Sequence, residues 1–500
     1  MPLVPNIVSI RLAALAFALS ILGFSTTGFA QSVTKIFDMN FFADINTGIG
    51  YGPNYPKGRL IPVGKNYWFL SENGGTFGFG GIFSFDPTTT NMTQIGAGFD
   101  NNTGHTPWGS LVIADGKAWF TTGSAGSGNR GTLAYIDTNT LATPTAVFNF
   151  PNNNNVSQLD CGEGPRSTPV LIGSELWMLT GSGGTNGGAR GTICRYNLTN
   201  GIMSPVFHFD GTNYGRQPFG SLVKHGDAYY FTTFAGGTNV NPSGYPNGAG
   251  TLGRVTFDNL GNPVVTKLIN LPTGYTAFPN GDVCPVGTNH LYFTTQGNTA
   301  SPGSLIRYDV VNNTWSNMFT FTAAAKTNYG SGPGASTPIH VDGNLYFTTQ
   351  TGGTSNKGVL LKYNIANHTM TKLVDFAGGG AASLGGGPQY HSATYVDDPD
   401  NCKKLIYMLI ARGGAYGPVA TGYGTLITIN LSVPVLTISN ATPGNLLLSW
   451  SGGYPPFTVQ SSTNLASTNW TTLVSVLTTN RTTIYATNSA RFFRVSSPCQ

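Results

Sequence analysis

The chain has 500 residues, of which 12% are aromatic and only 9% are Asp, Glu, Lys or Arg. Glycine, asparagine, threonine and serine are abundant, which is typical of β-structure with uncharged polar faces, and the aromatic content disfavours a disordered chain. The formal net charge of +5 comes without a cluster of Lys and Arg, so nothing supports nucleic-acid binding.

The N-terminus is interpreted as a secretory signal peptide over residues 1–30. An apolar run at 12–24 is followed by Gly28-Phe29-Ala30, a small-x-small cleavage pattern. The run is shorter than the roughly 18 to 20 apolar residues that span a bilayer, which disfavours the alternative of a retained membrane helix. We therefore expect a mature chain without a transmembrane segment, either secreted or at the cell surface.

The next part of the chain consists of repeats of one unit, which is clearest at 338–376. A short apolar strand is followed by LYFTTQ, a glycine-rich loop, VLLKYN and TMTKLVDF. Four strands of about five residues joined by Gly, Asn and Asp turns predict one antiparallel sheet. The glycines that open the third strand of each copy are Gly81, Gly131, Gly191, Gly250, Gly303, Gly358 and Gly424.

A four-stranded unit repeated every 50 to 66 residues is typical of a β-propeller, because one such sheet buries both faces only between neighbours. Seven units predict seven blades over 31–432. A fourth strand follows six of the units, and VTKIFDMNF at 33–41 echoes the fourth strand TMTKLVDF. We therefore expect an all-β, seven-bladed β-propeller whose N-terminal strand completes the last blade and closes the ring.

The repeat stops near Val433, and residues 433–500 contain six short alternating runs, as expected for a small β-sandwich. Trp450 alternates with Leu448 and is predicted to lie in the core, with Phe492 or Phe493 from the last strand. The alternative is that Trp450 contacts a ligand.

The repeated unit resembles the GloVer repeat, which occurs in tandem in secreted bacterial proteins with varied C-terminal anchors. The residues that carry the resemblance lie between about 33 and 431, and they are Gly74-Gly75, Gly183-Gly184, Gly236-Gly237 and Gly352-Gly353, followed by Gly131-Thr132, Gly191-Thr192, Gly250-Thr251 and Gly358. The resemblance implies a propeller and export, and it brings no established catalytic residues. The segments at 461–473 and 491–495 look like part of a fibronectin type III-like module, and no anchor is recognised.

The cysteines and histidines give no metal signature, and we expect neither a metal nor another cofactor. Five cysteines without a C-x-x-C pair leave at least one thiol unpaired in a monomer. Cys194 and Cys284 fall in predicted strands and are expected to be buried, although a bridge between Cys161 and Cys194 is an alternative. The glycine-rich loops lack the Gly-Lys-Ser/Thr ending of a phosphate-binding loop.

Loops that lead from one blade into the next hold most of the irregular polar and aromatic residues. Such loops on a rigid scaffold concentrate binding groups, and aromatic faces beside hydrogen-bonding side chains suit sugar rings. The candidates for ligand contact are Trp108, Arg166, Tyr214, Arg216, Tyr275, Tyr329, Tyr390 and His391. Packing at blade corners is the alternative role for the aromatic residues, whereas Arg166 and Arg216 have no evident packing role.

The sequence favours an exported, non-enzymatic propeller that binds a polysaccharide or a cell-surface protein on its loop face. One alternative is an extracellular glycosidase or lyase that uses Asp160, Glu163 and His391 at the channel mouth. A second alternative is a structural component of the cell surface. Fold alone does not separate these functions, because propellers host both binding and catalysis.

Overall fold

The computed structural model describes residues 8–10, 31–39, 52–151, 160–185, 190–239, 248–297, 302–389, 391–416, 422–432, 434–441, 445–464, 469–485 and 491–497. The predicted signal peptide lies outside this part, except for β1 (Val8–Ile10), whose backbone pairs with the last strand. The regular secondary structure of the described residues is almost wholly β-strand, with helical turns only at α1 (Lys326–Tyr329) and at the 3₁₀ turn Pro333–Ala335. Among these residues, no helix is long and apolar enough to cross a membrane.

The clearest repeat forms the predicted four-stranded antiparallel sheet. Its strands are β25 (Ile339–Val341), β26 (Asn344–Thr348), β27 (Val359–Asn364) and β28 (Thr369–Asp375), paired in chain order. Asp342 and Gly343 between the first two strands both have positive φ, 47° and 72°. This is the backbone that a two-residue hairpin turn with the twist of its strands requires.

The other copies of the unit form sheets with the same order of strands. The first contains β3 (Pro53–Val63), β4 (Asn66–Gly74), β5 (Gly81–Phe85) and β6 (Met92–Ile95). The second contains β7 (Val112–Ala114), β8 (Lys117–Thr122), β9 (Thr132–Asp137) and β10 (Thr145–Asn149). The third contains β12 (Val170–Ile172), β13 (Glu175–Ser182), β14 (Thr192–Asn197) and β15 (Met203–His208), with β11 (Glu163–Pro165) also paired to β13.

Two further sheets follow before the one already described. The fourth contains β16 (Val223–His225), β17 (Ala228–Thr233), β18 (Thr251–Phe257) and β19 (Pro263–Asn270). The fifth contains β20 (Cys284–Val286), β21 (His290–Thr295), β22 (Ser304–Asp309) and β23 (Thr314–Thr320). Two short strands, β24 (Ser336–Thr337) and β29 (His391–Ser392), extend the first sheet in parallel beyond β3.

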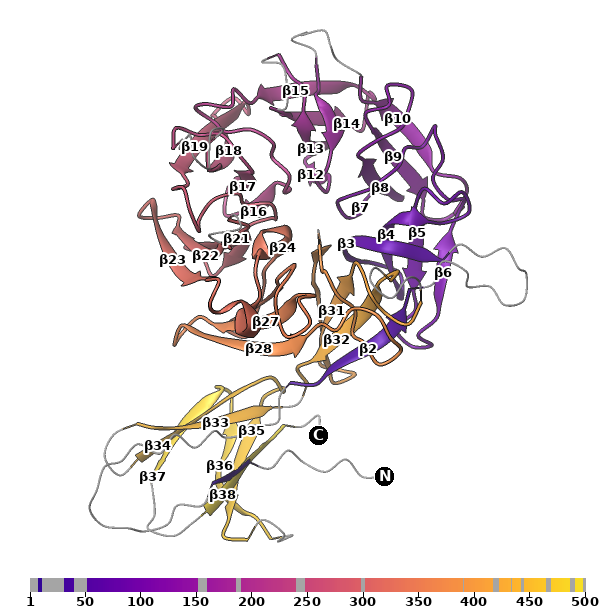
Figure 1. The fold of residues 1–500 in the computed structure, drawn as a ribbon. Helices are drawn as coiled ribbons and strands as arrows, with labels where there is room; N and C mark the ends of the chain where they lie inside the picture. Colours follow the sequence, from indigo (N-terminus) through magenta and orange to yellow (C-terminus); the bar gives the residue numbers. More distant parts are fainter. Residues whose placement is uncertain are drawn as a thin grey trace. The chain divides into compact units, whose positions relative to one another are not determined.

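Apolar cores lie between consecutive sheets. Leu70 and Ile82 of the first sheet pack with Phe120 and Ala134 of the second, and all four are fully buried. Similar clusters join the second to the third sheet, the third to the fourth, the fourth to the fifth, and the fifth to the sheet of β25–β28. Figure 1 shows these sheets following one another around a common centre, with the short strands β7, β12 and β16 innermost.

The N-terminal strand joins the last repeat, as the sequence echo predicts. The sheet order is β2 (Val33–Asp38), β32 (Thr425–Asn430), β31 (Lys403–Ile410) and β30 (Thr394–Asp398). Just beyond β2, the Met39 N–H donates to the Gly424 carbonyl at 2.9 Å, and Asp38 Oδ1 accepts from the Ala415 N–H at 2.9 Å. The Thr394 hydroxyl also donates to the Leu60 carbonyl of β3 at 2.8 Å.

The chain divides into two compact units, one of Lys35–Thr394 and Met408–Ile427, the other of Met1–Thr34, Tyr395–Tyr407 and Thr428–Gln500. The C-terminal strands of the second unit form two sheets. One sheet is β33 (Val435–Asn440), β34 (Asn445–Ser451) and β37 (Arg481–Tyr485). The other contains β35 (Phe457–Ser462), β36 (Thr471–Leu477) and β38 (Arg491–Ser496), with β1 at its edge.

The core of these two sheets contains Trp450, which is 5% exposed and packs edge-on against Phe457 with ring centroids 5.3 Å apart. Phe493 lies in the same core, whereas Phe492 is only partly buried. Trp450 is therefore a core residue, and the alternative of a ligand contact is wrong.

Three of the cysteines are buried free thiols: Cys161, Cys194 and Cys284. The burial predicted for Cys194 and Cys284 is confirmed. The alternative bridge between Cys161 and Cys194 is absent, because the Cys194 thiol instead donates to the Cys161 carbonyl oxygen, with Sγ 3.1 Å away. Cys402 is disulfide-bonded.

Candidate functional site

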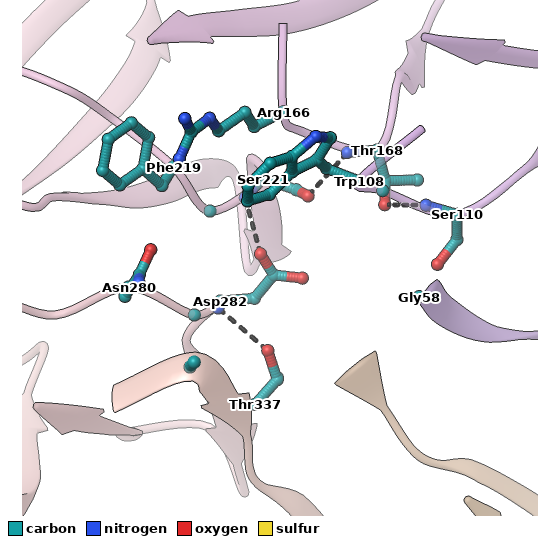
Figure 2. Close-up of a pocket in the computed structure, with 14 residues that line it drawn as sticks. Gly58, Trp108, Ser110, Arg166, Thr168, Phe219, Ser221, Asn280, Asp282 and Thr337 are labelled. Carbon is teal, nitrogen blue, oxygen red and sulfur yellow. Dashed lines mark hydrogen bonds between the residues drawn. The ribbon is translucent and has the colours of Figure 1, made fainter. Parts of the chain in front are cut away.

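A series of hydrogen bonds joins successive repeats at their inner ends, in or just before the innermost strands. In each bond, a backbone N–H of one repeat donates to a side-chain oxygen of the next repeat. The bonds are Arg59 to Ser110 (2.9 Å), Ser110 to Thr168 (2.8 Å), Thr168 to Ser221 (2.9 Å), Ser221 to Asp282 (2.5 Å) and Asp282 to Thr337 (2.9 Å). Figure 2 shows several of these residues together. We call the six residues Arg59, Ser110, Thr168, Ser221, Asp282 and Thr337 the inner ring.

Glycines beside the inner ring allow the sheets to approach closely. A Cβ on Gly109 would lie 2.5 Å from the Thr168 backbone nitrogen, and one on Gly220 would lie 2.8 Å from the Gly281 carbonyl oxygen. Contacts this short exclude any side chain, so glycine is required where the backbone of one sheet reaches the next. The inner ring is thereby held at a fixed spacing.

A small cavity of about 40 Å³ lies against the inner ring, on the side of the loops that precede the innermost strands. Trp108, Arg166, Phe219 and Asn280 contribute side chains to it, and each comes from the loop of a different repeat. The Asp282 carboxylate faces the same cavity (Figure 2). Aromatic rings, a guanidinium, an amide, hydroxyls and one carboxylate therefore meet at one place.

Arg166 is sandwiched between two aromatic rings. Its guanidinium carbon lies 4.0 Å from the centroid of the Trp108 ring and 4.3 Å from that of the Phe219 ring. A cation over an aromatic face at this distance is attracted by the quadrupole of the ring. The expectation that Arg166 has no packing role is wrong, because its side chain packs between aromatic rings from two other loops. Trp108 and Arg166, both predicted to contact ligand, do meet in one cavity.

An ion pair with a buried lysine and a partly buried glutamate lies beside this stack. Lys57 Nζ is 2.8 Å from Glu72 Oε2 and 5.3 Å from the centroid of the Trp108 ring. Burial lowers the pKa of Lys57, and the Glu72 carboxylate partly offsets this by favouring the charged amine. Like charges on Arg412 and Arg166 lower it further. The surroundings of the cavity are therefore rich in positive charge.

Asp282 is the acidic member of the inner ring. Burial raises the pKa of its carboxyl group, while the hydrogen bond from the Ser221 N–H and the charge of Arg59 act in the opposite direction. The carboxylate replaces the hydroxyl that serves as acceptor at Ser110, Thr168, Ser221 and Thr337.

A second cavity, of about 290 Å³, also borders the inner ring, and Asp282 and Thr337 line both cavities. Its other lining residues mostly belong to the innermost strands and include Val223, Cys284 and His340. Burial lowers the pKa of His340, so its imidazole is more readily neutral than an exposed histidine. This cavity is larger and more apolar than the first.

Two of the aromatic residues predicted to contact a ligand instead pack against the apolar cores. Tyr214 packs edge-on against Phe207, with ring centroids 4.8 Å apart, and Tyr329 packs against Phe319 at 5.2 Å. Both are partly buried against the apolar cores, so packing accounts for their positions. The Tyr275 carbonyl oxygen accepts from the Thr295 hydroxyl at 2.8 Å.

Three other candidates remain: Tyr390, His391 and Arg216. Tyr390 lies outside the described residues, and so does the side chain of His391. The backbone of His391 is in β29, where it pairs with Ser336 and Gly58. Arg216 forms a short antiparallel bridge with Ala235 in the loop before β16.

The proposed carboxylates of the alternative enzyme have structural partners. Asp160 is 3% exposed, and its two oxygens accept from the N–H groups of Gly162 at 2.7 Å and Gly184 at 3.0 Å. Glu163 Oε2 lies 3.3 Å from Arg130 Nε. Neither residue lines the two cavities described above. Within the described ranges, no group of three or more His, Cys, Asp and Glu side chains could hold a metal ion.

The inner ring itself was not predicted from the sequence. A signal for it is present, since a small residue followed by a side chain with a hydrogen-bonding oxygen recurs before the innermost strands. The pairs are Gly109-Ser110, Ser167-Thr168, Gly220-Ser221, Gly281-Asp282 and Ser336-Thr337. The recurrence becomes visible only when the repeats are aligned at this position.

Comparison with known proteins yields no family. No protein family matches the chain, and no curated protein matches it either. Among solved structures, it is similar to the extracellular domain of the putative hybrid two component system BT4673 from B. thetaiotaomicron, with a TM-score of 0.47 and 12% identity over 92% of this chain. The match spans 56% of that domain.

Two enzymes show lower similarity. An oligogalacturonate lyase in complex with manganese has a TM-score of 0.44 and 11% identity, covering 85% of this chain and 96% of the lyase. A europium-containing methanol dehydrogenase has a TM-score of 0.42 and 11% identity, covering 79% and 93%. Similarities this low do not assign a function. The functional argument therefore rests on the residues of this chain.

Proposed function

We propose that the chain is an exported, non-enzymatic binding protein of the GloVer-repeat type. In this proposal, seven four-stranded sheets form a propeller closed by β2, and the C-terminal sheets form a fibronectin type III-like module for attachment or adhesion. The ligand is a glycan that is held on the loop face of the propeller at the Trp108–Arg166–Phe219 cavity. The apolar run before Gly28-Phe29-Ala30 supports export.

The observation that carries the proposal is the convergence of side chains from several repeats on one cavity. Trp108, Arg166, Phe219 and Asn280 occupy corresponding loops yet differ in chemistry. Packing alone would favour similar apolar residues at corresponding positions. Amide, guanidinium and hydroxyl groups can hydrogen-bond sugar hydroxyls, and the aromatic rings supply apolar surface for sugar C–H groups. The cavity of about 40 Å³ admits only a protruding group of the ligand.

The test is binding of the purified full chain to a glycan array, followed by titration calorimetry on each hit. We expect Trp108→Ala and Arg166→Met to weaken binding at least about tenfold, the loss expected for removing a well-packed contact. Tyr485→Ala is the control, because Tyr485 is 76% exposed on the C-terminal sheets and far from the cavity residues in sequence. Thermal unfolding of each variant verifies that the fold is retained.

Two results would overturn the proposal. Absence of binding to every glycan would remove the ligand class and favour a protein ligand or a structural role. Turnover of a bound glycan that is abolished by Glu163→Gln would make the chain a carbohydrate-active enzyme, as in the alternative interpretation of the sequence.

A further inference from the structure

The side chains of Arg190 and Arg216 both lie beside Gly211, which is in the loop between the third and fourth sheets. A Cβ built on Gly211 would lie 3.6 Å from Arg190 Nε and 3.9 Å from Arg216 Cδ. Gly211 has φ of +82°, a conformation that side chains rarely adopt. The space above it is therefore left to the two arginines.

The backbone fixes both arginines. The Arg216 N–H donates to the Ala235 carbonyl at 2.8 Å, and the Gln217 N–H donates to the Arg190 carbonyl at 2.8 Å. The fold thus places the backbones of two like-charged residues side by side, and both side chains lie beside Gly211. Such an arrangement costs free energy unless an opposite charge compensates it.

The equivalent positions in the preceding repeat hold a compensated pair. Glu163 bridges to Ser182 as Arg216 bridges to Ala235, and the Gly164 N–H donates to Arg130 as Gln217 donates to Arg190. There the two side chains form an ion pair, with Arg130 Nε 3.3 Å from Glu163 Oε2.

One repeat earlier, the position equivalent to Glu163 and Arg216 is held by His105, which makes a favourable ring contact. His105 bridges to Ser124, and its ring stacks on Phe79 with centroids 3.9 Å apart. A salt bridge and a ring stack therefore occupy the positions that two cations occupy at Arg190 and Arg216.

No carboxylate compensates the arginine pair among the residues that the structure describes. Asp210, close in sequence, uses Oδ1 to accept from the N–H groups of Asn213 and Tyr214 and Oδ2 to accept from the Asn213 amide. Arg216 Nε is buried and has no hydrogen-bond partner in the described part of the chain. The segments 186–189 and 240–247 contain neither Asp nor Glu.

We propose that Arg190 and Arg216 form an anion-binding subsite for the carboxylate or sulfate groups of an acidic polysaccharide. Guanidinium groups match the planar or tetrahedral oxygens of such anions and form strong, charge-assisted hydrogen bonds. Phe219 lines the cavity proposed to hold the glycan, and Arg216 lies three residues before it in the same loop. We therefore assign the anionic groups to the polysaccharide. The inference thus rests on the proposed function and specifies its ligand class as acidic glycans.

The glycan experiment uses the full chain with alginate as the carboxylated polymer, dextran sulfate as the sulfated polymer and dextran as the neutral polymer. We expect an acidic polymer to bind at least about tenfold more tightly than dextran at low salt, with the difference reduced by added NaCl. Arg190→Gln and Arg216→Gln should each lower that affinity about tenfold. Arg195→Gln is the matched control, because Arg195 of β14 is already paired with Glu175 of β13.

A second measurement needs no glycan. Inorganic sulfate at constant ionic strength should raise the melting temperature of the wild type and of Arg195→Gln, and the shift should vanish in Arg190→Gln and Arg216→Gln. A sulfate shift that persists in both variants would overturn the subsite.

The outcomes separate the two proposals. Binding of neutral and acidic glycans with equal affinity, unaffected by either arginine substitution, would overturn the subsite and leave the glycan function standing. A sulfate shift lost in the variants without any polysaccharide binding would overturn the acidic-glycan ligand and the proposed function together, and would leave only an anion site. Equal losses in Arg195→Gln would also count against the subsite.

Discussion

The backbone N–H of Ser221 donates to Asp282 Oδ1 at 2.5 Å, joining the inner ends of the fourth and fifth sheets. Asp282 in turn donates its own N–H to the Thr337 hydroxyl oxygen. A carboxyl group thus occupies a link that hydroxyl groups occupy at the neighbouring joints. Its ionisation is coupled to the contact between two sheets.

The first prediction concerns the pH dependence of stability at Asp282. Because burial raises the pKa of this carboxyl group above its usual 3.8, the folded state holds the proton more tightly than the unfolded state. Its contribution to stability is therefore fully present below pH 3.8 and is lost as the pH rises through the raised pKa. Asp282→Asn should gain stability relative to the wild type between pH 4 and pH 7, measured by urea unfolding at both values. A difference that is independent of pH, or that falls as the pH rises, would contradict this.

The second prediction concerns a buried pair of hydroxyl groups in the fourth sheet. Thr233 Oγ1 lies 2.8 Å from Thr251 Oγ1 and also accepts from the Thr251 N–H at 3.0 Å. In the sheet of β25–β28, Val359 takes the place of Thr251, and its N–H donates to Thr349 Oγ1 at 3.1 Å. Thr251→Val also removes the hydroxyl that donates to the partly buried Tyr214 carbonyl at 3.0 Å, and it should lower the free energy of unfolding by about 1 kcal/mol. Thr233→Val leaves a buried N–H unsatisfied and should lower it by about 2 to 3 kcal/mol. Urea unfolding measures both, and the reverse ranking would disprove the argument.

The third prediction concerns the N-terminal strand. Deletion of 33–38 removes β2 from its sheet and leaves an edge of β32 unpaired, so the melting temperature should fall markedly. Asp38→Ala should cost about 1 kcal/mol, because Asp38 accepts from the Ala415 N–H. Unchanged thermal unfolding after the deletion would show that β2 does not close the fold.

The fourth prediction concerns the free thiols. Burial raises the pKa of Cys284 to about 12 and also raises that of Cys194. At pH 8 only about one Cys284 in ten thousand would be a thiolate, which is the reactive form. Iodoacetamide at pH 8 should therefore leave both cysteines unmodified in the native protein and label them in urea, as read by mass spectrometry. Rapid native labelling of Cys284 would mean that reagent reaches a reactive thiolate through the second cavity.

The sequence allows the strands to be predicted because their signals are local. Alternating apolar residues mark the strands, and turn pairs such as Asp342-Gly343 supply the positive φ of the hairpin. The echo of TMTKLVDF at 33–41 even predicts which sheet β2 joins.

The site is harder to predict because its contacts join distant parts of the chain. Arg166 lies between Trp108 and Phe219, and each of the three belongs to a different repeat, so no spacing reveals the sandwich. Asp160 suggested catalysis as a carboxylate in an irregular loop, but the amides of Gly162 and Gly184 occupy its oxygens. Which polar groups a backbone amide will engage depends on the folded path of the loop.

The inner ring limits how the number of repeats in the chain can change. Each described link uses a donor from one repeat and an acceptor from the next, so removing a repeat leaves one donor and one acceptor unmatched. Insertions between strands two and three leave these links intact, and copies of the unit accordingly differ in length. Loop length is free to diverge among the repeats, whereas gain or loss of a whole repeat requires links between repeats to be remade.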